Sequence, residues 1–95
     1  MFPVRIFLTI VGEGEKEIGY HKELNLPIPP FIGLKFNSEV GGLPFEIRVE
    51  DVEIGLEDSK VSLWATGRQE LPDSRGKSFF DNAIRYFDSH GWTKL

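Results

Sequence analysis

Three groups of residues have the side-chain types that binding or catalysis needs. The first is a Gly-Lys-Ser sequence, which ends the phosphate-binding P-loop motif and here precedes an expected helix. The complete motif needs a glycine at the position of Leu71 and parallel strands around it, so a nucleotide site is not predicted. The free N–H groups of a helix start still make residues 74–78 an alternative site for an anion, although an ordinary capped helix start is the simpler explanation. The residues of this candidate anion site are Arg75, Gly76, Lys77 and Ser78.

The second group is the pair of histidines. His21 is expected on a solvated strand, and His90 suits the negative end of the expected helix. A metal site needs several converging ligands, and the chain contains no cysteine. We therefore expect no metal, no cofactor and no enzymatic activity.

The third group is a concentration of acidic residues between positions 46 and 58, which lacks the spacing of a calcium loop. A solvated strand face is the simplest explanation of such a charge run. Trp64 is expected on the same face, and a tryptophan among acids is typical of an interface anchor for a basic protein. Alternatively, Trp64 is covered, because the sheet curls or because an expected loop at residues 37–44 folds over it. The residues of this candidate interface are Trp64, Glu46, Arg48, Glu50 and Glu53.

A proline-rich segment, LNLPIPPFIGLKF at residues 24–36, is a further candidate for recognition. Prolines cannot donate to a strand ladder, so residues 27–31 are expected to form a stiff corner between two paired strands, with Leu26 opposite Ile32. The segment also fits the Pro-x-x-Pro pattern of polyproline ligands, but it lacks their flanking arginine. A second candidate contact surface in this segment consists of Pro29, Pro30 and Phe31.

Alternation of apolar and polar residues predicts the strands that position these groups. Residues 2–11 and 17–26 are expected to form a hairpin, and residues 32–36 to continue the sheet. A strand from residue 45 to residue 56 changes its apolar parity, which a β-bulge near Glu50-Asp51 or a break into two short strands would explain. The expected pairs of the first hairpin are Ile10 with Ile18, Leu8 with Tyr20, Val4 with Leu24, and Phe2 with Leu26.

A second hairpin is expected from residues 52–57 and 60–66, around a two-residue loop at Asp58-Ser59. Trp64 then lies opposite Glu53, on the face away from the apolar side chains. The other expected pairs are Leu56 with Val61, Ile54 with Leu63, and Val52 with Ala65.

The chain ends in an expected helix with Ser78 as its N-cap. Gly91 is placed to end it in a Schellman motif, in which Phe87 and Trp92 touch. The apolar stripe of the helix is Phe80, Ala83, Ile84 and Phe87. Residues 1–95 therefore read as one α+β domain: an antiparallel five-stranded sheet with two clear hairpins and one C-terminal helix packed across its apolar face.

Composition limits the partners. The chain has 95 residues and a formal charge of −4. Its Lys and Arg residues are scattered along the sequence, so a basic face for binding nucleic acid is not expected. No apolar stretch is long enough to span a membrane, so a cytoplasmic protein is expected. The sequence favours a non-enzymatic protein-binding module, such as a small inhibitor or accessory subunit, that uses the acidic, tryptophan-bearing sheet face. Its partner is expected to be another protein, including a second copy of itself; the alternative is a small-molecule or anion-binding domain.

Overall fold

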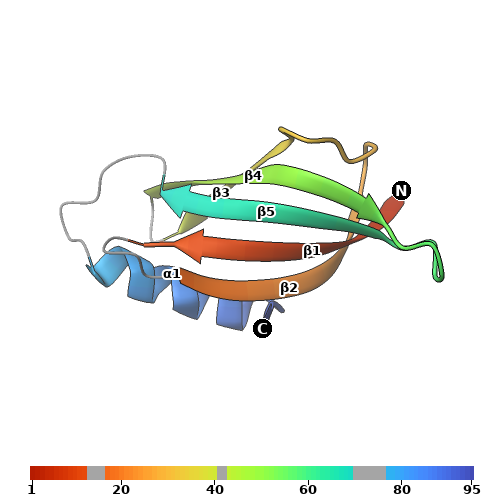
Figure 1. Ribbon diagram of the computed structural model, residues 1–95. Coiled ribbons are helices and arrows are strands. Elements are labelled where there is room, and N and C mark those ends of the chain that lie inside the picture. Colours follow the sequence, from red (N-terminus) through yellow and green to blue (C-terminus); the bar gives the residue numbers. More distant parts are fainter. Residues whose placement is uncertain (13–16, 41–42, 70–76) are drawn as a thin grey trace.

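The computed structural model describes residues 1–12, 17–40, 43–69 and 77–95. It confirms an α+β fold with one sheet and one C-terminal helix (Figure 1). The elements are β1 (Phe2–Val11), β2 (Glu17–Leu26), β3 (Lys35–Val40), β4 (Leu43–Ile54), β5 (Val61–Gln69), α1 (Lys77–Ser89) and β6 (Thr93–Lys94).

The expected five-stranded antiparallel sheet is wrong in two respects. The described strands form a six-stranded sheet in the order β3-β4-β5-β1-β2-β6, and β1 and β5 pair in parallel. β6 pairs only Thr93 and Lys94 with β2, which is too short to show an alternating pattern. The parallel pair joins strands far apart in the sequence, and periodicity within one strand does not reveal its neighbour.

The first hairpin is confirmed in every expected pair, including Leu8 opposite Tyr20 and Ile10 opposite Ile18. A slip of one residue would turn the apolar side chains of β1 outward, so the register is strongly specified. Lys22 falls on the apolar face of this hairpin. Its ammonium group reaches the end of α1 and donates to the carbonyl oxygen of His90 at 2.8 Å. A cation there also complements the negative end of α1.

The proline segment does not form the predicted corner between paired strands. β3 pairs with β4, with Lys35 opposite Arg48, and β2 and β3 lie far apart in the sheet order. The expected strand at residues 32–36 begins only at Lys35, because Gly33 adopts a φ of 92° and the chain turns there.

Residues 27–34 instead carry the chain across one end of the sheet (Figure 1). An extended chain of this length reaches about 25 Å, at about 3.1 Å per residue, and the four strand spacings from β2 to β3 measure roughly 19 Å. A stiff, proline-rich segment without a hydrogen-bonding ladder suits this crossing. It joins the β4 edge where the N–H of Gly33 donates to the carbonyl of Val49 at 2.8 Å.

The loop expected at residues 37–44 is largely strand. β3 and β4 remain paired as far as Val40 and Leu43. Only Gly41 and Gly42 lie between them, and both are outside the described residues. The sequence signal for this hairpin is a Gly-Gly pair between two strands.

The β-bulge in β4 is confirmed between Val49 and Asp51, but the expected register of the next hairpin is wrong by two residues. Ile54, and not Leu56, lies opposite Val61. The loop is longer than two residues, because the N–H of Gly55 donates to the carbonyl of Lys60 at 2.9 Å. A shift of two residues keeps the same side chains on each face, so apolar patterning could not detect it.

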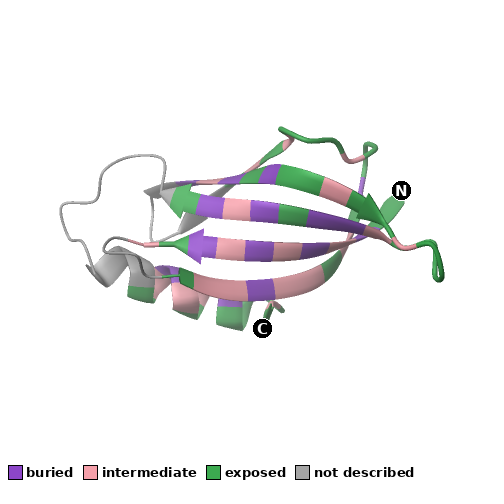
Figure 2. Ribbon diagram, in the orientation of Figure 1, coloured by how far each residue is buried: buried purple, intermediate pink, exposed green. Residues whose placement is uncertain are grey.

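The core lies between the sheet and α1, which packs on the side of β2 (Figure 1). Burial alternates along β1 and β5 (Figure 2). The ring of Phe87 lies 5.6 Å from that of Tyr20 and 5.7 Å from that of Phe45.

α1 begins at Lys77, so Ser78 lies in its first turn and is not the predicted N-cap. From the predicted stripe, Ala83 and Phe87 are buried and Ile84 is half-buried, whereas the side chain of Phe80 is outside the described part.

The predicted Schellman end of α1 is confirmed. The N–H of Trp92 donates to the carbonyl of Phe87 at 3.3 Å, and Gly91 has a φ of 82°. The Trp92 ring packs edge-on against Phe87 with 5.5 Å between the centroids, the apolar contact that usually accompanies this motif.

Two substitutions test this helix. Gly91→Ala should lower the free energy of unfolding by about 1 kcal/mol, because alanine resists the left-handed conformation. Phe87→Ala should cost roughly 3–4 kcal/mol, because it opens a cavity in the core. Urea unfolding of both variants measures the two costs, and the opposite ranking would show that Phe87 does not pack as described.

Tyr20 gives a pH-dependent test of the same core. Burial raises the pKa of Tyr20 from 10.0 to about 12, and the nearby carboxylate of Asp88 acts in the same direction. Because the folded pKa lies above the unfolded one, the stabilisation is complete below pH 10 and is lost as the pH rises towards 12. The difference between these two pKa values corresponds to roughly 2–3 kcal/mol of folding stability.

Urea unfolding of the wild type and of Tyr20→Phe between neutral and alkaline pH isolates this effect. We expect the wild type to lose more stability than the variant above the unfolded pKa of tyrosine, since phenylalanine cannot ionise. Parallel curves for the two proteins would mean that Tyr20 ionises freely in the folded state.

Candidate functional site

The face of the sheet opposite α1, called the outer face here, carries a row of three rings. Phe7 in β1 is the direct partner of Trp64 in β5 and of His21 in β2. The Phe7 and Trp64 rings stack at 4.5 Å with 16° between their planes, and His21 lies 6.3 Å from Phe7. Besides these rings, the outer face includes Arg5, Glu23, Asp51, Glu53, Ser62 and Thr66.

Trp64 is exposed, with 43 % of its surface accessible. Of the two sequence interpretations, the structure supports the exposed one. The described residues of the segment 37–44 are in β3 and β4 and do not form a loop over the ring. Phe7 was missed as a functional residue, because its place beside Trp64 depends on the parallel pairing of β1 and β5.

The acidic neighbour of Trp64 differs from the expected one. Asp51 lies directly opposite Trp64, and Glu53 lies opposite Ser62. The two-residue shift of the hairpin register causes the difference. One carboxylate oxygen of Asp51 accepts the N–H of Val52 at 2.9 Å, which orders this side chain beside the bulge. Glu50, at the bulge itself, is exposed.

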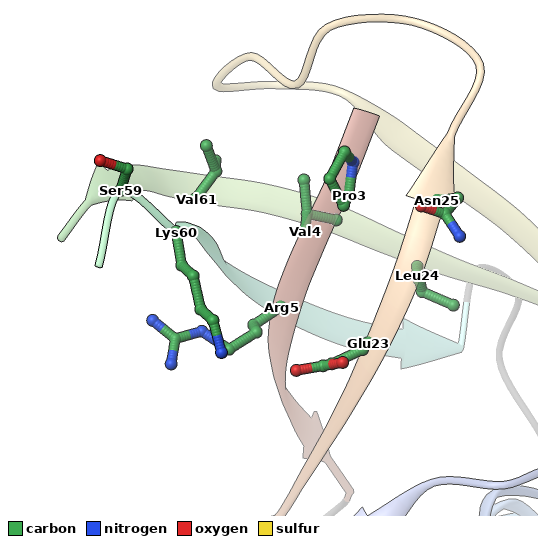
Figure 3. Close-up of a pocket in the computed structure, with 9 residues that line it drawn as sticks. All are labelled: Pro3, Val4, Arg5, Glu23, Leu24, Asn25, Ser59, Lys60 and Val61. Carbon is green, nitrogen blue, oxygen red and sulfur yellow. The ribbon is translucent and has the colours of Figure 1, made fainter. Parts of the chain in front are cut away.

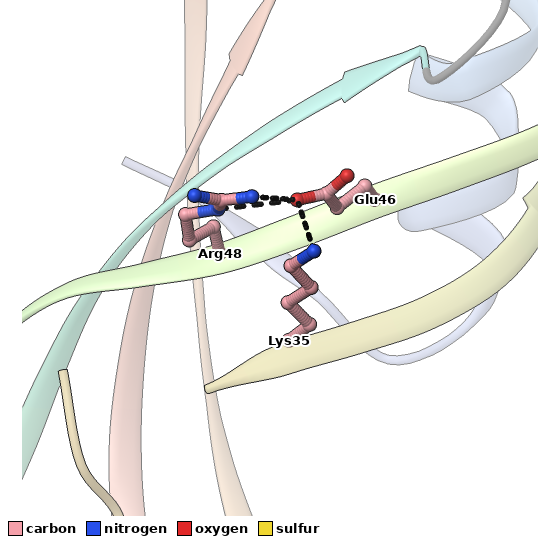
Figure 4. Close-up of polar contacts among 3 residues, drawn as sticks. All are labelled: Lys35, Glu46 and Arg48. Carbon is pink, nitrogen blue, oxygen red and sulfur yellow. Dashed lines mark hydrogen bonds and ion pairs between the residues drawn. The ribbon is translucent and has the colours of Figure 1, made fainter. Parts of the chain in front are cut away.

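The other predicted charges of β4 form a separate ion-pair group (Figure 4). Arg48 donates twice to one oxygen of Glu46, at 2.9 and 3.1 Å, and the ammonium of Lys35 lies 3.9 Å from the same oxygen. The hydrogen bond from Arg48 lowers the pKa of Glu46, and the charge of Lys35 acts in the same direction. Glu46 is therefore neutralised locally, whereas the acids on the other side of the bulge are not part of this group.

Two of the hollows in the described part of the chain share Arg5 and Glu23, and the second of them adjoins the row of rings. The first, of about 500 Å³, also includes Lys60 (Figure 3). The second, of about 640 Å³, includes Phe7 and His21. Both hollows are lined by charged and apolar side chains.

Arg5 connects the hollows to the start of β5. Its guanidinium donates to the hydroxyl of Ser62 at 3.2 Å and lies 3.7 Å from the carboxylate of Asp58. The pKa of Asp58 is lowered, first by the N–H of Lys60 and then by the charge of Arg5. These contacts fix the side chain of Arg5 at the edge of the aromatic row.

The remaining predicted site residues lie elsewhere. Pro29, Pro30 and Phe31 are in the connection across the end of the sheet, with Phe31 52 % exposed. These three residues therefore lie outside β5, the strand that carries Trp64. In the candidate anion site, Arg75 and Gly76 are outside the described residues. Lys77 and Ser78 are in the first turn of α1, and their side chains are not described.

The part of the chain that the structure describes contains no group of three His, Cys, Asp or Glu side chains suited to hold a metal ion. Its helix is too short to cross a membrane. No protein family, curated protein or solved structure matches this chain. The outer face therefore has to be interpreted from its own geometry.

A double-mutant cycle tests the ring stack. Phe7→Ala, Trp64→Ala and the double variant are unfolded with urea, and the coupling free energy is calculated from the three changes. We expect a coupling of about 0.5–1.5 kcal/mol, as found for stacked aromatic pairs. Additive effects would show that the two rings do not interact in solution.

Proposed function

We propose that this protein is a non-enzymatic protein-binding module, such as a small inhibitor or accessory subunit, and that it binds through the outer face. The observation that carries the proposal is the exposure of Trp64 in a central strand. Its neighbours in β5, Leu63 and Ala65, are buried on the other face. The fold thus uses the inner face of this strand for its core and leaves a large aromatic side chain in water.

Burial of that ring by a partner would be favourable. Apolar surface removed from water contributes about 25 cal/mol per Å², and tryptophan is among the residues most often found as interface anchors. Its stack on Phe7 already restricts the ring, so little side-chain entropy is lost upon binding. Strands also hold such an anchor more rigidly than a loop does.

The charge of the outer face favours a protein partner over nucleic acid. Arg5 and Arg48 are accompanied by acidic residues on the same face, including Asp51 and Glu53, and the whole chain has a formal charge of −4. Nucleic acids select surfaces with a continuous excess of positive charge. The anion-binding alternative depends on residues 74–78, of which 74–76 lie outside the described residues.

A capture experiment with matched variants tests this function. Wild-type protein, Trp64→Ala and Leu56→Ala are immobilised and exposed to a lysate of the cells that produce the protein. Leu56 is the control because it is 92 % exposed in the loop between β4 and β5, away from the aromatic row. We expect a protein that wild type and Leu56→Ala retain in equal amounts and that Trp64→Ala loses.

Circular dichroism first establishes that all three proteins are folded, so that loss of binding is not loss of structure. Retention of the same proteins by Trp64→Ala would contradict the proposal. Capture that depends on Leu56 but not on Trp64 would move the interface to the end of the sheet.

A further inference from the structure

We infer that the outer face receives an arginine side chain of the partner, whose guanidinium group lies on the open face of the Trp64 ring beside the carboxylates of Asp51 and Glu53. This inference rests on the proposed function, because it names the chemistry of the partner at the same surface. It commits to a basic segment of another protein.

The stack with Phe7 determines which side of the indole is open. Phe7 covers one face of the ring at 4.5 Å. Because β5 lies between β1 and β4 in the sheet order, the other face is directed towards β4. The side chain opposite Trp64 in β4 is Asp51, which is too short to cover an indole. Phe7 covers one face only and Trp64 keeps 43 % of its surface exposed, so we place the open surface on the second face and the ring edge.

The charge beside this open ring face is negative. Asp51 and Glu53 are both exposed, and among the described residues neither takes part in an ion pair. The basic residue of the same strand, Arg48, is bound to Glu46 at 2.9 Å, on the other side of the bulge. The site thus combines an aromatic face with two carboxylates that form no ion pair among the described residues.

A cation satisfies both features. The face of an indole attracts a positive group, and the carboxylates add electrostatic attraction. Arginine fits better than lysine, because its planar guanidinium stacks on the ring while its N–H groups donate to a carboxylate. A partner with an acidic or neutral segment would leave Asp51 and Glu53 without counter-charge.

The test uses nuclear magnetic resonance of the ¹⁵N-labelled protein. The probe is the peptide acetyl-Gly-Arg-Gly-Arg-Gly-amide, and the matched control has citrulline, which has the shape of arginine without its charge, at both arginine positions. The indole N–H signals of Trp64 and Trp92 are followed during each titration. Trp92 is the internal control, because its ring packs against Phe87.

We expect the arginine peptide to shift the Trp64 signal progressively, with saturation in the millimolar range, and to leave Trp92 unchanged. The citrulline peptide should bind at least about tenfold more weakly, a difference of about 1.4 kcal/mol. The double variant Asp51→Asn with Glu53→Gln should weaken binding of the arginine peptide to a similar extent, and added salt should weaken it in the wild type.

Equal shifts with both peptides, or no shift of Trp64 with either, would overturn the inference.

Light scattering of the protein alone provides a second measurement. A dimer that disappears in Trp64→Ala would show that a second copy occupies the ring face, and it would overturn the inference as well. If the captured protein still depends on Trp64 while the arginine peptide fails, only the partner chemistry is wrong. Failure of both experiments would remove the proposed function too.

Discussion

The parallel pairing of β1 with β5 is the constraint on which the other features depend. It joins the hairpin of β1 and β2 to the meander of β3, β4 and β5, and so makes one sheet from two segments. Its register puts Leu8 beside Ala65 on the inner face and Phe7 beside Trp64 on the outer face. A shift by one residue would expose the core of β1 and bury its polar positions. The apolar core therefore keeps both rings on the outer face, and the register of this pairing puts them side by side.

This coupling explains why the outer face is suited to recognition. Its anchor stands between two buried residues of β5, Leu63 and Ala65, so the position of Trp64 follows from the core and not from a loop. The bulge in β4 then divides the charges of this face. Arg48 and Glu46 neutralise each other before it, whereas Asp51 and Glu53 lie beside or near the indole after it. A surface of this kind selects a partner by charge as well as by apolar contact.

The sequence predicted what local patterns determine, and it failed where distant strands meet. Alternation gave the first hairpin in its correct register, and glycine chemistry gave the end of α1 at Gly91. The strand order was not predicted, because the proline segment has the pattern of a corner between two paired strands although it spans the end of the sheet. The site shows the same division: Trp64 was found from its parity along the strand, but Phe7 and Asp51 acquire their roles only through pairing.

Nuclear Overhauser spectroscopy of the isolated protein tests this account most directly, because it reports which rings are close in solution. The structure requires contacts between the ring protons of Phe7 and the indole protons of Trp64, whose centroids are 4.5 Å apart. Contacts between Phe87 and Tyr20 should appear independently on the other side of the sheet. Cross-peaks that join Trp64 to Phe87, with none to Phe7, would place the tryptophan in the core and contradict both the register and the binding face.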